Sequence, residues 1–222
     1  MVAPAPHGGQ AVEGRGRPLG EGRAVLLLVH GRNAAPRNIL DLVPALQHPE
    51  FTYLAPAAAN QTWYPQSFLA ETEKNEPGIT SGIAVIHGLI EECLRRGIPS
   101  QRIVVLGFSQ GACLACTAAF RRPARYGGVV AYSGGLIGPP GTVFEAPRAF
   151  EGTPVFLGCS DVDAHVPKTR VDETAAAFER AGAQVVERIY PGMGHIVNDD
   201  EMAFTRELME RTVSTSTLPD RP

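Results

Sequence analysis

The stretch VVLGFSQGACLAC, residues 104–116, begins as a run of β-branched and apolar residues and continues as a helix-like run of small and apolar residues. Ser109 stands between the two halves, and a glycine lies two residues away on either side, at Gly107 and Gly111. Side chains at those two positions would collide if a strand turned sharply into a helix at the serine. The pattern G-x-S-x-G therefore predicts a strand, a tight turn and a helix, with the Ser109 hydroxyl exposed on the bend.

Around this stretch, strand-like and helix-like segments alternate, which predicts an α/β fold with a mostly parallel sheet and helices on both of its faces. The segment RAVLLLVHG is an unbroken apolar run that suits a strand buried on both faces. The expected strands cover residues 23–31, 51–56, 102–108, 127–134, 153–160 and 184–192. The expected helices cover residues 36–48, 79–97, 110–122, 169–182 and 199–212.

We expect one domain at residues 24–212, because a chain of 222 residues can bury about 70% of its unfolded surface in a single core. Residues 1–23 are rich in Gly, Pro and Arg and are expected to form an N-terminal tail, or at most a marginal edge strand near residues 10–14. Residues 213–222 are expected to form a frayed C-terminal tail.

The 20 basic side chains are balanced by 23 acidic ones and form no basic run, which argues against a nucleic acid partner. The N-terminal segment has no apolar leader, and no later apolar run reaches the roughly 20 residues that span a bilayer. We therefore expect a soluble, cytoplasmic protein without a membrane span.

The four cysteines are too few for a disulfide scaffold at this length, and all are expected to be reduced. Cys113 and Cys116 form a C-x-x-C motif, but they fall inside an Ala-rich helical segment with no second C-x-x-C and no neighbouring histidine. The motif is therefore interpreted as core packing, and neither a metal nor a cofactor is expected.

A serine hydroxyl becomes a good nucleophile only when a base takes its proton, and the base needs a carboxylate to orient it. Proteins with this type of turn place the partners in the chain order Ser, acid, His, each after a later strand. His195, in the glycine-flanked loop after the last expected strand, is the best-placed histidine. Asp161 and Asp163 both follow the 153–160 strand, and spacing alone does not choose between them.

Attack by Ser109 would also need N–H donors for the oxyanion. The expected donors are the backbone N–H of Gln110, at the start of the helix, and that of Arg32, in the loop after the first buried strand. The long aperiodic segment 56–78 and the loop 134–152 are expected to form the substrate pocket. The candidate apolar wall residues on these loops are Trp63, Tyr64, Phe68 and Leu136.

The sequence resembles the phospholipase/carboxylesterase family, the compact α/β-hydrolases that include bacterial carboxylesterases and acyl-protein thioesterases. The matching segments, in the family's order, are LLLVHGRNA, APAAANQTWYP, GFSQGACLA, YSGGL, GCSDVDAHVP and PGMGH. The resemblance implies an α/β-hydrolase fold without a separate cap domain and makes a homodimer plausible. It also implies a triad of Ser109, Asp163 and His195, because the family's acid precedes a Val-Pro pair at the spacing found after Asp163.

Two positions depart from the family pattern. Ala164 stands where the family commonly has a proline, which relaxes the loop after the acid. Asn33 stands where the family has a glycine, and asparagine still tolerates a left-handed backbone. Neither change removes a chemical group that the resemblance implies.

Together, these features predict a serine hydrolase of small apolar or aryl carboxylic esters that works through an acyl-enzyme. A thioesterase for longer acyl chains and a lactone hydrolase are the alternatives within the same chemistry. A non-catalytic ligand-binding protein on the same fold is the alternative of a different class, since a fold does not by itself fix a function.

Overall fold

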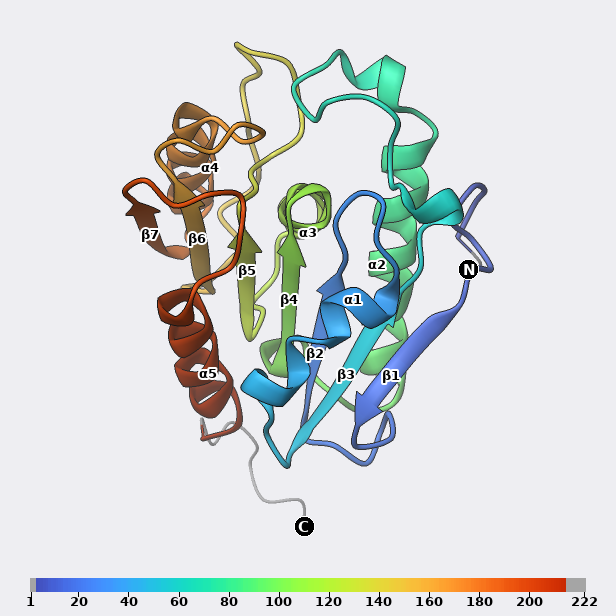
Figure 1. Ribbon diagram of the computed structural model, residues 1–222. Coiled ribbons are helices and arrows are strands. Elements are labelled where there is room, and N and C mark those ends of the chain that lie inside the picture. Colours follow the sequence, from blue (N-terminus) through green and yellow to red (C-terminus); the bar gives the residue numbers. More distant parts are fainter. Residues whose placement is uncertain (1–2, 215–222) are drawn as a thin grey trace.

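The computed structural model describes residues 3–214 and places seven strands in one sheet of order β1-β3-β2-β4-β5-β6-β7 (Figure 1). Only β1 is antiparallel, and the other strands run parallel to their neighbours. The strands are β1 (Val12–Gly16), β2 (Ala24–Val29), β3 (Phe51–Pro56), β4 (Ile103–Phe108), β5 (Gly128–Tyr132), β6 (Pro154–Ser160) and β7 (Gln184–Tyr190). The prediction of a mostly parallel sheet is confirmed.

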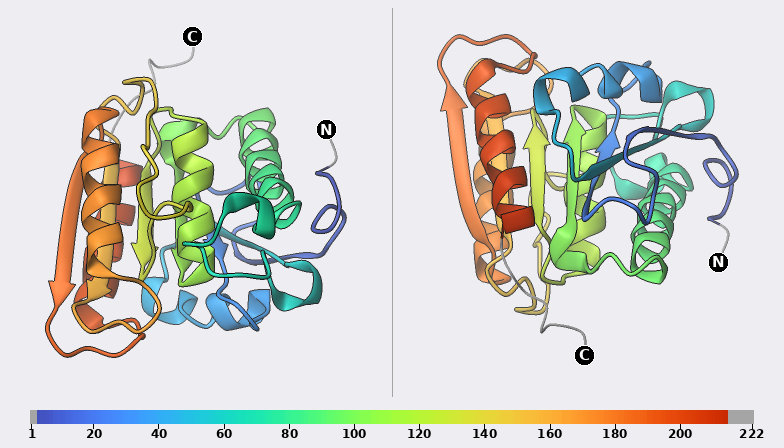
Figure 2. Two further views of the ribbon diagram at one scale, coloured as in Figure 1. Left: turned by 90° about the horizontal axis from the view of Figure 1, so that it is seen from above. Right: turned by 90° about the horizontal axis from the view of Figure 1, so that it is seen from below.

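The helices form one layer on each face of the sheet, as Figure 2 shows in its two views. They are α1 (Pro36–Leu40), α2 (Gly78–Arg95), α3 (Gln110–Arg121), α4 (Lys168–Arg180) and α5 (Asp199–Ser214). One core lies between the sheet and α2, α3 and α4, and the other lies between the sheet and α1 and α5. Short 3-10 turns occur at Val43–Leu46, Ala59–Gln61, Thr72–Asn75 and Ser100–Arg102.

Strand β2 explains why the first apolar run is unbroken. Every residue of β2 is buried, and alternate side chains enter opposite cores. Val25 and Leu27 belong to the core under α2 and α3, whereas Leu26 and Leu28 belong to the core under α1 and α5. A central parallel strand therefore has no face that favours polar residues.

The helix expected at residues 36–48 is shorter than predicted. It ends at Leu40, and the chain continues as a 3-10 turn at Val43–Leu46. Pro44 accounts for the difference, because it has no N–H to donate and its ring clashes with the carbonyl four residues earlier in a continuous α-helix.

At the N-terminus the expected edge strand is present as β1, which pairs with β3. The residues before β1 are packed against the domain rather than forming a tail, since His7 is buried. At the other end α5 extends to Ser214, and the rest of the expected tail, residues 215–222, lies outside the described residues. Within residues 3–214 no helix is both long and apolar enough to cross a membrane.

Candidate active site

Ser109 occupies the sharp turn between β4 and α3. Its backbone angles are φ 56° and ψ −122°, a conformation that costs a non-glycine residue about 1–3 kcal/mol. A Cβ at Gly107 would lie 2.4 Å from the backbone of Gly111, and a Cβ at Gly111 would lie 2.1 Å from the carbonyl oxygen of Val29. Both glycines are therefore required by the close approach of strand and helix. The Ser109 side chain makes no capping hydrogen bond, which leaves its hydroxyl available.

A chain of hydrogen bonds joins three loops at the carboxyl edge of the sheet. His195 Nε2 lies 2.8 Å from Ser109 Oγ, and His195 Nδ1 lies 2.7 Å from Asp163 Oδ2. Ser109 follows β4, Asp163 follows β6 and His195 follows β7. The structure thus brings together the serine, the histidine and Asp163, while Asp161 bonds elsewhere, to the backbone N–H of Gly192.

Asp163 is held as a carboxylate by its surroundings. Burial raises the pKa of its carboxyl, but hydrogen bonds from His195 and from the backbone N–H groups of His165 and Val166 outweigh burial and lower the pKa below its usual value. The thiol of Cys159 also faces Asp163, and burial raises the pKa of Cys159 to about 12. The neighbouring thiol therefore stays protonated and does not compete as an anion.

The two backbone N–H groups expected to bind an oxyanion lie on segments beside Ser109. Gln110 is the first residue of α3, so its N–H has no acceptor within the helix. Arg32 follows β2, and its guanidinium donates to the carbonyl oxygens of Pro65 at 2.8 Å and Gln66 at 2.6 Å. Asn33 adopts a left-handed backbone with φ 57°, the conformation that asparagine tolerates where the family pattern has glycine.

A cavity of about 710 Å³ opens next to Ser109 and His195. Of the expected wall residues, Tyr64 and Phe68 line it. Further apolar lining comes from residues that the sequence analysis did not single out, namely Ile39, Phe108 and Val166. Phe108 could have been found from its place next to Ser109, and Val166 from its place in the loop of the acid.

The expectation that Trp63 and Leu136 line the pocket is wrong. Trp63 is fully buried, and its indole N–H donates to the carbonyl oxygen of His30 at 2.9 Å. Leu136 is also buried, and its backbone N–H donates to Thr174 Oγ1 on α4. Both residues lie in aperiodic loops, where spacing does not show which side chains turn inward.

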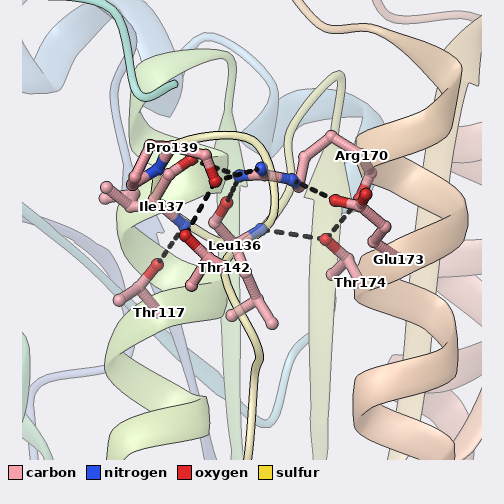
Figure 3. A network of polar contacts seen from close by, with 9 residues as sticks. Thr117, Leu136, Ile137, Pro139, Thr142, Arg170, Glu173 and Thr174 are labelled. Carbon is pink, nitrogen blue, oxygen red and sulfur yellow. Dashed lines mark hydrogen bonds and ion pairs between the residues drawn. The ribbon is translucent and has the colours of Figure 1, made fainter. Parts of the chain in front are cut away.

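Arg170 of α4 holds the loop that contains Leu136 (Figure 3). Its buried guanidinium donates to the carbonyl oxygens of Leu136, Gly138 and Pro139 at 2.8, 2.7 and 3.1 Å. The backbone N–H of Gly138 in turn donates to the carbonyl oxygen of Phe68 at 3.0 Å. The cavity wall at Phe68 is therefore linked through this loop to α4.

His165 is a further neighbour of the site, and no sequence motif singles it out. Its ring packs edge-on against the ring of His195, with centroids 4.8 Å apart, and it lines the cavity while remaining exposed. Its position in the loop of Asp163 was the only sequence signal for this contact.

The four cysteines are free and buried. Cys113 and Cys116 lie within α3, and burial raises the pKa of Cys113 to about 11. Among residues 3–214, no three histidine, cysteine or acidic side chains are grouped so that they could hold a metal ion.

The chain is similar in sequence and in fold to several known proteins. A family model described as Phospholipase/Carboxylesterase matches residues 18–213. An acyl-protein thioesterase 1 from Eremothecium gossypii is 30% identical over 185 residues, which cover 73% of this chain and 76% of that protein. An acyl-protein thioesterase 1 from Neurospora crassa is 31% identical over 124 residues, which cover 55% of this chain and 51% of that protein.

Among solved structures, a phospholipase/carboxylesterase from Dyadobacter fermentans is 33% identical, with a TM-score of 0.87, covering 94% of this chain and 99% of that one. The Bacillus cereus carboxylesterase is similar in fold, with 20% identity and a TM-score of 0.72 over 92% of this chain and 95% of that one. The chain thus has the α/β-hydrolase fold in a single compact domain.

Proposed function

Because the chain belongs to the phospholipase/carboxylesterase family, we propose that it hydrolyses carboxylic esters with Ser109 as nucleophile, His195 as general base and Asp163 as the residue that orients His195. The observation that carries this proposal is the hydrogen-bond chain from Asp163 through His195 to Ser109, at 2.7 and 2.8 Å, beside the cavity. The family membership expected from the sequence motifs is confirmed, and the assignment of these three roles is the proposal.

In the acylation step, Ser109 Oγ attacks the ester carbonyl while His195 Nε2 takes its proton. The Asp163 carboxylate accepts the Nδ1–H of His195, which fixes the tautomer and stabilises the imidazolium that forms. The backbone N–H groups of Gln110 and Arg32 are proposed to donate to the oxyanion of the tetrahedral intermediate. His195 then gives the proton to the leaving alcohol, and the acyl group stays on Ser109.

In the deacylation step, a water molecule takes the place of the alcohol. His195 Nε2 removes a proton from the water as the water attacks the acyl carbon, and the same two N–H groups receive the second oxyanion. Collapse of this intermediate breaks the bond to Ser109 Oγ, which takes back the proton from His195. The products are a carboxylic acid and the original serine.

The cavity supports small apolar or aryl esters as substrates. Its volume of about 710 Å³ suits a small organic molecule, and its apolar lining includes Phe68, Phe108 and Val166. Thioesters of longer acyl chains are a second candidate, favoured by the similarity to two proteins named acyl-protein thioesterase 1. A lactone hydrolase would use the same attack by Ser109 on a cyclic ester.

A fluorophosphonate probe tests the core of the proposal, because it reacts with an activated serine. The wild-type protein should be labelled at Ser109, and Ser109→Ala should not be labelled. An unlabelled wild-type protein that is folded would favour a non-catalytic ligand-binding protein instead. A hydrolysis panel that varies acyl length, oxygen against sulfur leaving groups, and open against lactone esters would then define the substrate.

A further inference from the structure

His7 is buried although it lies near the start of the chain, in a segment outside residues 18–213 matched by the family model. Its Nδ1 lies 3.0 Å from the backbone N–H of Ala59 and accepts that hydrogen bond. The proton of the neutral ring is therefore on Nε2, which donates to the carbonyl oxygen of Trp63 at 2.8 Å. The backbone N–H of His7 donates to Ser81 Oγ on α2, so the backbone of His7 is held as well as its ring.

His30, directly after β2, makes a matching contact with Ala58, the residue before Ala59. Its Nε2 accepts the N–H of Ala58 at 3.1 Å, and its Nδ1–H donates to the carbonyl oxygen of Gly31 at 2.8 Å. Two consecutive backbone N–H groups, of Ala58 and Ala59, therefore each donate to a neutral imidazole. The Trp63 ring lies next to both imidazoles, with centroids 5.1 Å from that of His7 and 5.1 Å from that of His30.

The segment that these two histidines hold, residues 58–64, is here called the bridging loop. On one side, the N–H of Trp63 donates to Gln110 Oε1 at 2.9 Å, and Gln110 Nε2 donates to the carbonyl oxygen of Tyr64 at 2.8 Å. On the other side, the carbonyl oxygen of Gln61 accepts the N–H of Asn33 at 2.8 Å. The bridging loop therefore contacts Gln110, one proposed oxyanion donor, and Asn33, which directly follows Arg32, the other proposed donor.

We infer that His7 is a positioning residue for the oxyanion site, because it fixes the bridging loop at Ala59 and Trp63. The loop in turn holds Gln110 by its side-chain amide and holds the chain next to Arg32 by the N–H of Asn33. The inference rests on the proposed ester hydrolysis. Oxyanion donors act only when they lie close to the place where charge develops, and misplacement by about 1 Å can cost roughly 100-fold in rate. A ground-state ester carries no such charge, so loss of His7 should affect kcat more than KM.

Three substitutions distinguish the contributions of the two hydrogen bonds made by the His7 ring. His7→Leu removes both bonds, whereas His7→Asn keeps an acceptor near the position of Nδ1 and His7→Gln keeps a donor near the position of Nε2. Gln10→Ala is the matched control, since Gln10 belongs to the same segment but is exposed. All variants are assayed at pH about 8, above the ordinary histidine pKa of about 6.5, so that the imidazoles are neutral.

For His7→Leu we expect kcat on an aryl acetate to fall about tenfold, with KM within about twofold of wild type. An alkylboronic acid, whose tetrahedral serine adduct places an oxygen in the oxyanion site, should bind about tenfold more weakly. His7→Asn and His7→Gln should each recover part of the loss, and Gln10→Ala should match wild type. Emission of Trp63, the only tryptophan, should shift in His7→Leu because one of the two imidazoles next to its ring is gone.

The inference is wrong if folded His7→Leu keeps the wild-type kcat, or if KM for the ester rises as much as kcat falls while boronate affinity is unchanged. If His7→Leu does not fold, the two partial variants decide, because full kcat in both of them would contradict a positioning role. Failure of the proposed function would be seen in the wild-type protein, which would then neither hydrolyse esters nor react with the fluorophosphonate probe. The inference about His7 would then also be wrong.

Discussion

The carboxylate of Asp161 accepts a hydrogen bond of 2.8 Å from the backbone N–H of Gly192, in the loop that carries His195. Asp163, two residues further along, bonds the His195 ring itself at 2.7 Å. The two aspartates that spacing could not separate thus hold the same loop at two points, one through its backbone and one through its imidazole. Their substitution should have different consequences.

Asp163→Asn should lower kcat for an aryl ester by about 10³–10⁴-fold, because an amide neither fixes the histidine tautomer nor stabilises the imidazolium. Asp161→Asn should keep activity within about fivefold of wild type, because the amide oxygen can still accept the Gly192 N–H. Steady-state hydrolysis by the two variants measures the difference. If only the Asp161 change abolished turnover, the assignment of Asp163 would be wrong.

Gly111→Ala should prevent the turn at Ser109 from forming. The new Cβ would lie 2.1 Å from the carbonyl oxygen of Val29 and 2.4 Å from that of His30, and backbone atoms of a central strand cannot move aside. We expect a loss of about 3 kcal/mol or more in the free energy of unfolding, together with loss of labelling by the probe. Wild-type stability in this variant would contradict the packing described for the turn.

Gly88→Ala is the matched control for that substitution. Gly88 lies inside α2, and a Cβ there would meet no heavy atom within 4 Å. Alanine in a helix interior is favoured over glycine by about 1 kcal/mol, so this variant should be more stable than wild type, with Tm higher by about 2–4 °C. Thermal unfolding followed by circular dichroism measures both glycine variants.

The turn at Ser109 and the choice of His195 could be predicted from the sequence because their signals are local. The two glycines around the serine indicate a tight turn, because larger side chains would collide there. Chain order places the histidine after the last strand. Spacing did not separate Asp161 from Asp163, because both follow the same strand in a loop without regular geometry. The family resemblance favoured Asp163, and the structure places that residue against His195.

The contacts of the bridging loop could not be predicted. His7 meets Ser81 and Trp63 across 74 and 56 residues of sequence, and no local pattern reports such a pairing. Trp63 was expected to face the substrate because it is a large aromatic residue in a long loop. It turns inward because two imidazoles and the carbonyl oxygen of His30 provide partners for its ring and its N–H.

Arg170→Met should destabilise the protein and loosen the wall of the cavity. The substitution leaves the carbonyl oxygens of Leu136, Gly138 and Pro139 without their donor, at a total cost of about 3 kcal/mol. Because the N–H of Gly138 donates to the carbonyl oxygen of Phe68, the wall should shift, and KM for aryl esters should rise more than kcat falls. Urea unfolding and steady-state kinetics measure the two effects.

Glu173→Gln separates the buried contacts of Arg170 from its surface ion pair. Glu173 lies 2.7 Å from Arg170 Nε, but its side chain is 49% exposed. A pair of this kind is screened by water, so the variant should lose no more than about 1 kcal/mol and keep the wild-type KM. Equal losses in the Arg170 and Glu173 variants would mean that the loop contacts contribute little.

Glu201 is a buried carboxyl at the start of α5. Its Oε2 accepts the N–H of Asn198 and its own N–H donates to Asn198 Oδ1, which together cap the helix. Its Oε1 has no hydrogen-bond partner among the described residues. This oxygen lies close to Gly158, where an added Cβ would be only 2.1 Å from it. Burial raises the pKa of Glu201 from 4.5 to about 7, so the folded protein favours the protonated form.

The raised pKa of Glu201 makes the free energy of unfolding depend on pH. Below the unfolded pKa of 4.5, Glu201 is protonated in both states and its burial carries no ionic penalty. Between pH 4.5 and about 7 the unfolded chain loses this proton while the folded protein keeps it, so stability falls across this range, by a total on the order of 3 kcal/mol. Glu201→Gln should therefore be more stable than wild type at pH about 8 and differ little at pH about 5.

Urea unfolding at the two pH values tests this expectation, with the exposed Glu207 on the same helix as the matched control. Glu207→Gln removes the same charge without relieving a buried carboxylate, so it should follow wild type within about 0.5 kcal/mol at both pH values. The amide oxygen of Glu201→Gln can still accept the N–H of Asn198, so the helix cap is kept and the comparison isolates the charge. A gain of equal size at both pH values would show that the substitution acts through packing rather than through ionisation of Glu201.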